Sequence, residues 1–187
     1  MSLTKKIIDY KEHKNDVNHW IRLKGEYRYE AMIRLFGDSI KCTWENLTDA
    51  IKYDRRIQHN CFKYYILLED VFRAALNRKG LLKIGGDTFD GFRSIINDYV
   101  IKCNDDFIEG MSYETIKENI NVVIEFRNSI MHNDILLGNT FDDKTLKESI
   151  EILYKVLPKD YKPGFMRDIN GSKNKLSPEL DDLFIEL

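Results

Sequence analysis

The stretch that decides the fold is IQHNCFKYYILLEDVFRAALNRKG, residues 57–80, which has the clearest periodicity in the chain. Its apolar residues recur at steps of three and four, at Ile57, Cys61, Tyr64, Tyr65, Leu68, Phe72, Ala75 and Leu76. This spacing places them on one face of an α-helix. Lys79 and Gly80 end the pattern, and Thr43 is a suitable cap before Trp44. We predict a long helix here, as the central element of the fold.

Other apolar stripes predict further helices on both sides of this one. We expect them at 5–14, from 16 to about 36, from 92 to 100, from 113 to about 133, and between 142 and 158. No stretch alternates polar and apolar residues for long enough to require a sheet. The predicted fold class is therefore all-α, an antiparallel helical bundle of four to five main helices.

The prolines divide the chain, because all three follow residue 157. We expect the bundle to occupy residues 1–157, where no proline interrupts a helix. The rest, 158–187, is rich in turn residues and low in apolar ones. It is predicted to be an extended C-terminal tail with one short acidic helix in ELDDLFIEL, residues 179–187.

Composition narrows the class of protein. A chain of 187 residues with 43% apolar content is long enough for one domain with a sizeable core. Its formal net charge is −2, so any nucleic-acid site must be a local patch. Three widely spaced cysteines, Cys42, Cys61 and Cys103, indicate reduced thiols and a cytoplasmic location. No segment has the roughly 20 apolar residues of a membrane span. No motif for a metal or cofactor is present, and none is expected.

Polar side chains interrupt the apolar stripe in IEFRNSIMHND, residues 124–134. Arg127 offers a charged planar fork that suits a phosphate. His132 can transfer protons near neutral pH, and Asn128 can orient a hydroxyl or a phosphate oxygen. Together these groups could cleave RNA without a metal, because the imidazole can assist attack by the ribose 2′-OH while the guanidinium stabilises the charged transition state. DNA lacks the 2′-OH and would not react.

Helix geometry sets a condition on this site. At about 100° per residue, Asn128 and His132 share a face, whereas Arg127 and His132 lie about 140° apart. One phosphate can reach both only if the helix is distorted or ends near His132, or if both side chains reach toward a ligand or a second chain. The structural alternative is that Arg127 pairs with Glu125 or with an acid of another helix, while His132 satisfies a carbonyl at the helix C-terminus.

The segment FRNSIMH, residues 126–132, resembles the R-N-x-x-x-H form of the motif of the HEPN superfamily, especially its Abi-like members, which are associated with abortive phage infection and toxin–antitoxin loci. Members of this superfamily are helical bundles, commonly dimers, in which two motifs face each other and form a composite, metal-independent ribonuclease site. The resemblance implies that Arg127 binds phosphate, His132 transfers a proton and Asn128 supports them. It also implies a homodimer. Residues 158–187 lie outside it.

Two charged residues of the central helix are further candidates. Glu69 and Arg73 are four apart, a spacing that gives an exposed salt bridge along one helix. The alternative is that Glu69 or Arg73 faces the site of Arg127 and His132 and orients it.

The function predicted from these features is a metal-independent endoribonuclease of a bacterial phage-defence or toxin–antitoxin system. Its partners would be RNA, a second copy of the chain and an antitoxin protein, with no membrane. A second hypothesis is a non-catalytic helical module that binds a nucleotide or a partner protein through Arg127 and His132, since some HEPN proteins are of this kind.

Overall fold

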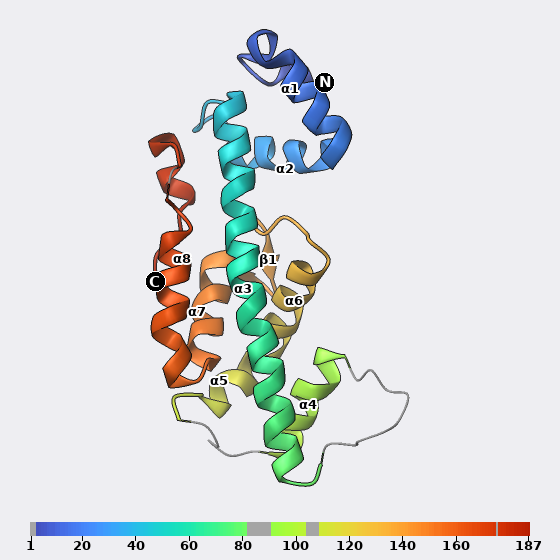
Figure 1. The fold of residues 1–187 in the computed structure, drawn as a ribbon, viewed down its shortest axis with the longest axis vertical. Coiled ribbons are helices and arrows are strands. Elements are labelled where there is room, and N and C mark those ends of the chain that lie inside the picture. Colours follow the sequence, from blue (N-terminus) through green and yellow to red (C-terminus); the bar gives the residue numbers. More distant parts are fainter. Residues whose placement is uncertain (1–2, 82–90, 104–108, 175) are drawn as a thin grey trace.

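The computed structural model describes residues 3–81, 91–103, 109–174 and 176–187. The all-α class is confirmed, because the described residues are mostly helical and hold one antiparallel pair of two-residue strands (Figure 1). The helices are α1 (Tyr10–Lys24), α2 (Glu26–Phe36), α3 (Trp44–Arg78), α4 (Phe92–Lys102), α5 (Tyr113–Glu118), α6 (Ile120–Met131), α7 (Leu146–Val156) and α8 (Lys162–Gly171). Three 3₁₀ turns are η1 (Leu3–Lys5), η2 (Lys159–Tyr161) and η3 (Pro178–Leu183), and the strands are β1 (Thr140–Phe141) and β2 (Lys144–Thr145).

Helix α3 is the central element, as predicted, and runs along the long axis of the molecule (Figure 1). The hydroxyl of Thr43 caps it by accepting the backbone N–H of Asn46 at 3.2 Å. It ends at Arg78, and Gly80 follows with a φ of 67°. Helices α2, α4, α6 and α8 all pack against it. The predicted apolar stripe of α3 is buried, and it is the surface on which these helices pack.

Two helices predicted as continuous are broken. The helix expected over 16–36 is two, α1 and α2, which meet at Gly25, where φ is 85°. An L-residue rarely adopts this angle, so glycine allows the turn. The helix expected from 113 to 133 is divided into α5 and α6 at Asn119. The side-chain amide of Asn119 donates to the carbonyl of Thr115 at 2.9 Å, a local bond that competes with the helix ladder.

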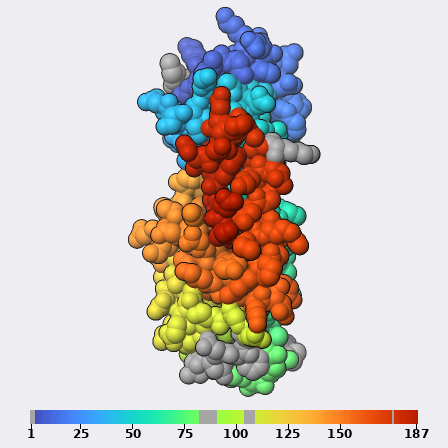
Figure 2. Space-filling model, turned by 90° about the vertical axis from the view of Figure 1, so that its left-hand side faces the viewer, coloured from blue at the N-terminus to red at the C-terminus, as the bar shows by residue number. Residues whose placement is uncertain are grey.

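The prediction that the chain is extended after residue 157 is wrong for α8, which is a helix. Pro163 lies in its first turn, where the missing N–H costs nothing. Phe165 and Ile169 are four apart and fully buried. The acidic helix expected at the C-terminus is the 3₁₀ turn η3, after which the N–H of Ile185 donates to the hydroxyl of Tyr53 at 2.8 Å. In Figure 2 these C-terminal residues lie along the surface of the elongated molecule.

Aromatic rings fix the position of α6. Phe126 packs edge-on against Tyr65 of α3, with ring centroids 5.8 Å apart, and Phe141 of β1 lies 4.9 Å from it on centroids. Phe126 is fully buried, so the residue that follows it, Arg127, begins at the edge of the core. Separately, no helix in the described part of the chain has both the length and the apolar composition needed to cross a membrane.

Candidate functional site

The three polar residues of the motif all reach the surface from α6. Phe126 and Ile130 bury the helix, while His132, its C-cap residue, is exposed and Asn128 is partly exposed. The side chain of Arg127 is 24% exposed. The interleaving of apolar and polar residues therefore has a direct structural cause, since α6 is buried on one side only.

Arg127 is held by groups from two other helices. Its Nη2 lies 3.8 Å from Oε2 of Glu69 on α3, and its guanidinium carbon lies 5.5 Å from the ring centre of Phe92 on α4. Its Nη1 also donates to Oδ1 of Asn128 at 3.4 Å. The other oxygen of Glu69 accepts from Nη2 of Arg73 at 2.9 Å. One carboxylate thus holds two guanidinium groups, which leaves one net positive charge at the surface.

These contacts bear on both interpretations of the sequence. Glu69 and Arg73 form the expected pair along α3, and Glu69 also faces Arg127, as the sharper interpretation required. Equally, Arg127 pairs with an acid of another helix, as the structural alternative required. The imidazole of His132 makes no hydrogen bond or ion pair with the residues that the structure describes. The carbonyl contact expected for it in that alternative is therefore not found.

Helix α6 stays regular to its end. The backbone N–H of His132 donates to the carbonyl of Asn128 at 2.8 Å, and the backbone angles of His132 are −80° and −2°. The chain turns only at Asn133, where φ is 62°. Since no bend precedes His132, the angle of about 140° between Arg127 and His132 persists. Helix α6 ends at His132, but its regular geometry does not by itself bring the two side chains to the same side.

Buried side chains hold the segment that follows His132. Nη2 of Arg28, on α2, donates to the carbonyl of Asn133, and Nε2 of Gln58, on α3, donates to the carbonyl of Asp134. Both donors are buried. The backbone just after the histidine is therefore fixed from two helices.

Asp54 completes this arrangement from deeper in the core. Its Oδ1 accepts the backbone N–H groups of Leu136 at 2.8 Å and Leu137 at 2.9 Å, and its Oδ2 accepts from Gln58 at 2.7 Å. Burial raises the pKa of Asp54 above the ordinary value, although the two backbone N–H groups lower it. We call Arg28, Asp54 and Gln58 the loop clamp. Sequence reasoning missed it; its only local signal is two polar residues four apart within the apolar stripe of α3.

His59 lies closer to the motif than its sequence position suggests. A cavity of about 280 Å³ between α3 and the end of α6 is lined by Arg55, Gln58, His59, Phe62, Ile130 and Asn133. This brings the imidazole of His59 to the same cavity as the residue after His132.

Other reactive groups are placed away from this surface or are inert. In the ranges given above, no three His, Cys, Asp or Glu residues are placed to hold a metal ion. Cys61 is fully buried and burial raises the pKa of its thiol, so it is not an activated nucleophile.

Comparison of the chain with protein-family models, with curated proteins and with solved structures finds no match. The interpretation of the site therefore rests on its own geometry and on the motif.

Proposed function

We propose that the protein is a metal-independent endoribonuclease whose active site is completed by a second copy of the chain. Arg127 binds the scissile phosphate, His132 accepts the proton of the attacking 2′-OH, and Asn128 orients a phosphate oxygen. A bond forms between the 2′ oxygen and phosphorus, and the bond from phosphorus to the 5′ oxygen breaks. The 5′ oxygen takes up a proton from water, so the products are a 2′,3′-cyclic phosphate and a 5′-hydroxyl.

The observation that carries this proposal is the contrast between Arg127 and His132 on one helix. The arginine is oriented by Glu69 and Phe92. A group that stabilises the charge of a transition state is most effective when it is already in position and need not reorganise during the reaction. The histidine is exposed and unpartnered among the described residues, so it is available to exchange protons.

Two exposed apolar side chains near the Glu69–Arg127 pair support the second copy. Ile66 is 49% exposed and Met131 is 46% exposed. Helices α3 and α6 run antiparallel, because Gln58 contacts Asp134 while Glu69 contacts Arg127. Ile66 precedes Glu69 by about one turn, and Met131 follows Arg127 by one turn, so both are displaced from that ion pair in the same direction. Contact with a second copy would cover this surface and bring a second motif close.

The biological setting belongs to the same proposal and rests on the resemblance alone. A ribonuclease of this kind would act in phage defence or in a toxin–antitoxin pair, with an antitoxin protein as its partner. Loss of protection against phage in cells that carry His132→Ala would support this setting.

The test is cleavage of RNA by the purified protein in EDTA. His132→Ala should reduce the rate at least about a hundredfold, the usual effect of losing a proton-transfer group. Arg127→Ala should cost a similar factor through lost charge stabilisation. Asn121→Ala is the matched control, since Asn121 is an exposed amide of the same helix. Mass spectrometry of the products should find the cyclic phosphate.

Mixing the two inactive variants tests the composite site. If each site takes Arg127 from one copy and His132 from the other, a mixed dimer keeps one intact site, and part of the activity returns. Absence of cleavage by the wild type, or equal cleavage by wild type and both variants, would contradict the enzyme proposal.

One contact favours the second candidate, a binding module without catalysis. The carboxylate of Glu69 already neutralises part of the charge that Arg127 would offer to a phosphate. RNA binding that depends on Arg127, with no cleavage by the wild type, would select this candidate.

A further inference from the structure

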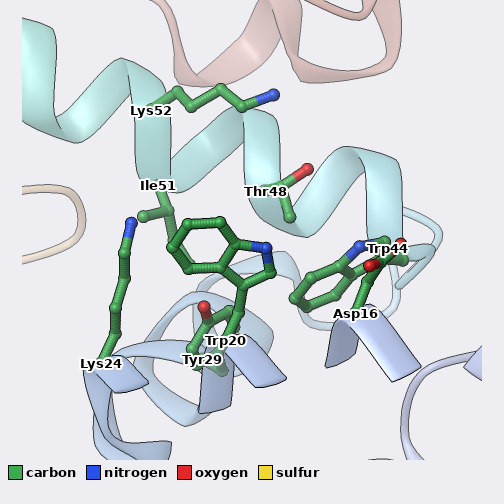
Figure 3. Close-up of a pocket in the computed structure, with 8 residues that line it drawn as sticks. All are labelled: Asp16, Trp20, Lys24, Tyr29, Trp44, Thr48, Ile51 and Lys52. Carbon is green, nitrogen blue, oxygen red and sulfur yellow. The ribbon is translucent and has the colours of Figure 1, made fainter. Parts of the chain in front are cut away.

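A second site lies at the other end of α3 from the Glu69–Arg127 pair, where α1 and α2 pack beside it (Figures 1 and 3). A cavity of about 410 Å³ opens there, a size typical of small-molecule sites. It is lined by Asp16, Trp20, Lys24, Tyr29, Trp44, Thr48, Ile51 and Lys52. Both tryptophans of the chain are among these residues. None of the roles proposed above uses them.

The floor of this cavity is aromatic and carries polar groups without partners. Tyr29 is 3% exposed and Trp44 is 7% exposed, and their rings stack with centroids 5.7 Å apart. Neither the hydroxyl of Tyr29 nor the indole N–H of Trp44 makes a hydrogen bond within the described ranges. Burial raises the pKa of Tyr29, so its hydroxyl stays protonated. Neither of these two polar atoms is fully enclosed, so both can hydrogen-bond to water or to a ligand in the cavity.

The walls of the cavity are charged at opposite ends. Asp16, Trp20 and Lys24 follow one another at steps of four, so they form a single line along α1. The acid and the lysine are thereby separated by about 12 Å along the helix axis. In Figure 3 Asp16 lies beside Trp44, and Lys24 lies on the far side of Trp20. The space between the two charges is occupied by the aromatic rings.

Lys24 is the cation that this cavity leaves available. Its Nζ lies 4.5 Å from the ring centre of Trp20 and forms no ion pair with any described acid. Lys52, on the α3 side, is already paired with Asp49 at 2.9 Å. The lining therefore offers a positive charge at one end, a carboxylate at the other, and flat apolar surface between.

The geometry points to a nucleotide as the ligand of this cavity, with its base against the indole rings of Trp20 and Trp44, an amino group of the base toward Asp16, and its phosphate on Lys24. Stacking on aromatic rings is favourable for every base, because each has a flat π-face. The ammonium of Lys24 binds phosphate as a point charge.

A cationic ligand fits this cavity less well. Two tryptophans and a tyrosine beside an acid could form a cage for a quaternary ammonium group. Here, however, Lys24 already lies over the face of Trp20, and it would repel a second cation at that ring. Lys24 therefore makes the Trp20 end of the cavity favourable for an anionic group.

The test uses the tryptophan fluorescence of the whole protein, because both indoles line the cavity and no other tryptophan contributes. Excitation at the red edge of the tryptophan band avoids absorption by the ligand. Titration with AMP should give a saturable change in the fluorescence. Adenosine, which lacks the phosphate, should bind more weakly. A short oligoadenylate is tested in parallel. Saturation by AMP identifies a free nucleotide as the ligand, and saturation by the oligomer alone identifies a nucleotide within a strand.

Variants on the exposed side of α1 locate the site without disturbing the core. Lys24→Glu should weaken binding by about tenfold or more, the loss expected for a charged hydrogen bond. Arg22→Glu makes the same charge reversal in the same turn of α1, but Arg22 does not line the cavity, so its affinity should stay within about twofold. Trp20→Ala should also weaken binding, with Trp44 still reporting it.

No saturable change with either AMP or the oligomer would overturn this inference. So would equal losses in Lys24→Glu and Arg22→Glu. Neither outcome bears on RNA cleavage by Arg127 and His132, so the two proposals fail separately.

Discussion

Two carboxylates of α3, Asp54 and Glu69, hold the two ends of the segment that carries the candidate site, and they differ in burial. Asp54 is 1% exposed and accepts hydrogen bonds from two backbone N–H groups and from Gln58. The side chain of Glu69 is 26% exposed and contacts the guanidinium groups of Arg73 and Arg127. The buried acid fixes where the backbone runs, and the surface acid fixes where one side chain points.

The physical consequence of this difference is a division of roles. When a buried acceptor is removed, the backbone N–H groups it satisfied find no water and the folded state loses stability. When a surface carboxylate is removed, water replaces it at little cost, and what changes is orientation and local charge. We therefore expect variants at Asp54 to change mainly stability, and variants at Glu69 to change mainly activity.

The largest effect is expected for Asp54→Ala. It leaves the N–H groups of Leu136 and Leu137 buried without an acceptor, which should reduce the free energy of unfolding by about 3 to 5 kcal/mol. Urea denaturation followed by circular dichroism measures it. Asp70→Ala is the control, because Asp70 is an exposed acid of the same helix and should change stability by less than about 0.5 kcal/mol. Equal losses in the two variants would remove the distinction drawn above.

Asp168 of α8 is an intermediate case, with a side chain 20% exposed. Partial burial raises its pKa, but the hydrogen bonds from Lys63 and Tyr64 outweigh this effect. The pKa of Asp168 is therefore below the ordinary value. A lowered pKa means that the ionised form stabilises the fold. This contribution is complete above about pH 4, the unfolded value, and is lost as the pH falls through the lower folded value.

The corresponding variant is Asp168→Asn. At neutral pH it should reduce the free energy of unfolding by about 1 to 2 kcal/mol, because hydrogen bonds to a charged acceptor are replaced by weaker ones. The difference from the wild type should shrink below about pH 4, where the wild-type carboxyl is also becoming neutral. Unfolding by urea at a series of pH values measures this. A difference that stays constant down to strongly acidic pH would show that the charge of Asp168 does not stabilise the contact between α3 and α8.

The sequence predicts the elements whose signals are local. Helix α3 carries its own cap at Thr43, an unbroken apolar stripe, and a stop at Lys79 and Gly80, so it is found from sequence alone. The breaks at Gly25 and Asn119 are hidden because the apolar residues continue on both sides. Helix α8 is hidden because proline and glycine within its first turn indicate a loop when they are only counted.

The candidate site shows the same limit. Arg127, Asn128 and His132 are close in sequence and are found as a motif. The loop clamp is not, since Asp54 and Leu136 are 82 residues apart and nothing local connects them. The contact between Glu69 and Arg127 could be stated only as one of two alternatives, because the spacing along α3 equally allows an isolated pair with Arg73.

The smallest change in stability, and the clearest effect on the proposed reaction, is expected for Glu69→Gln. The free energy of unfolding should change by less than about 0.5 kcal/mol, because the ion pair lies at the surface. The loss of a negative charge should strengthen RNA binding and lower KM. The value of kcat should fall about tenfold, because Arg127 is no longer oriented and charge stabilisation depends on orientation.

Asp70→Asn removes the same charge from the adjacent residue, where it touches no arginine, and should lower KM without lowering kcat. If both variants keep the wild-type kcat, Glu69 does not position Arg127 for catalysis, and its contact with that residue is only a surface ion pair.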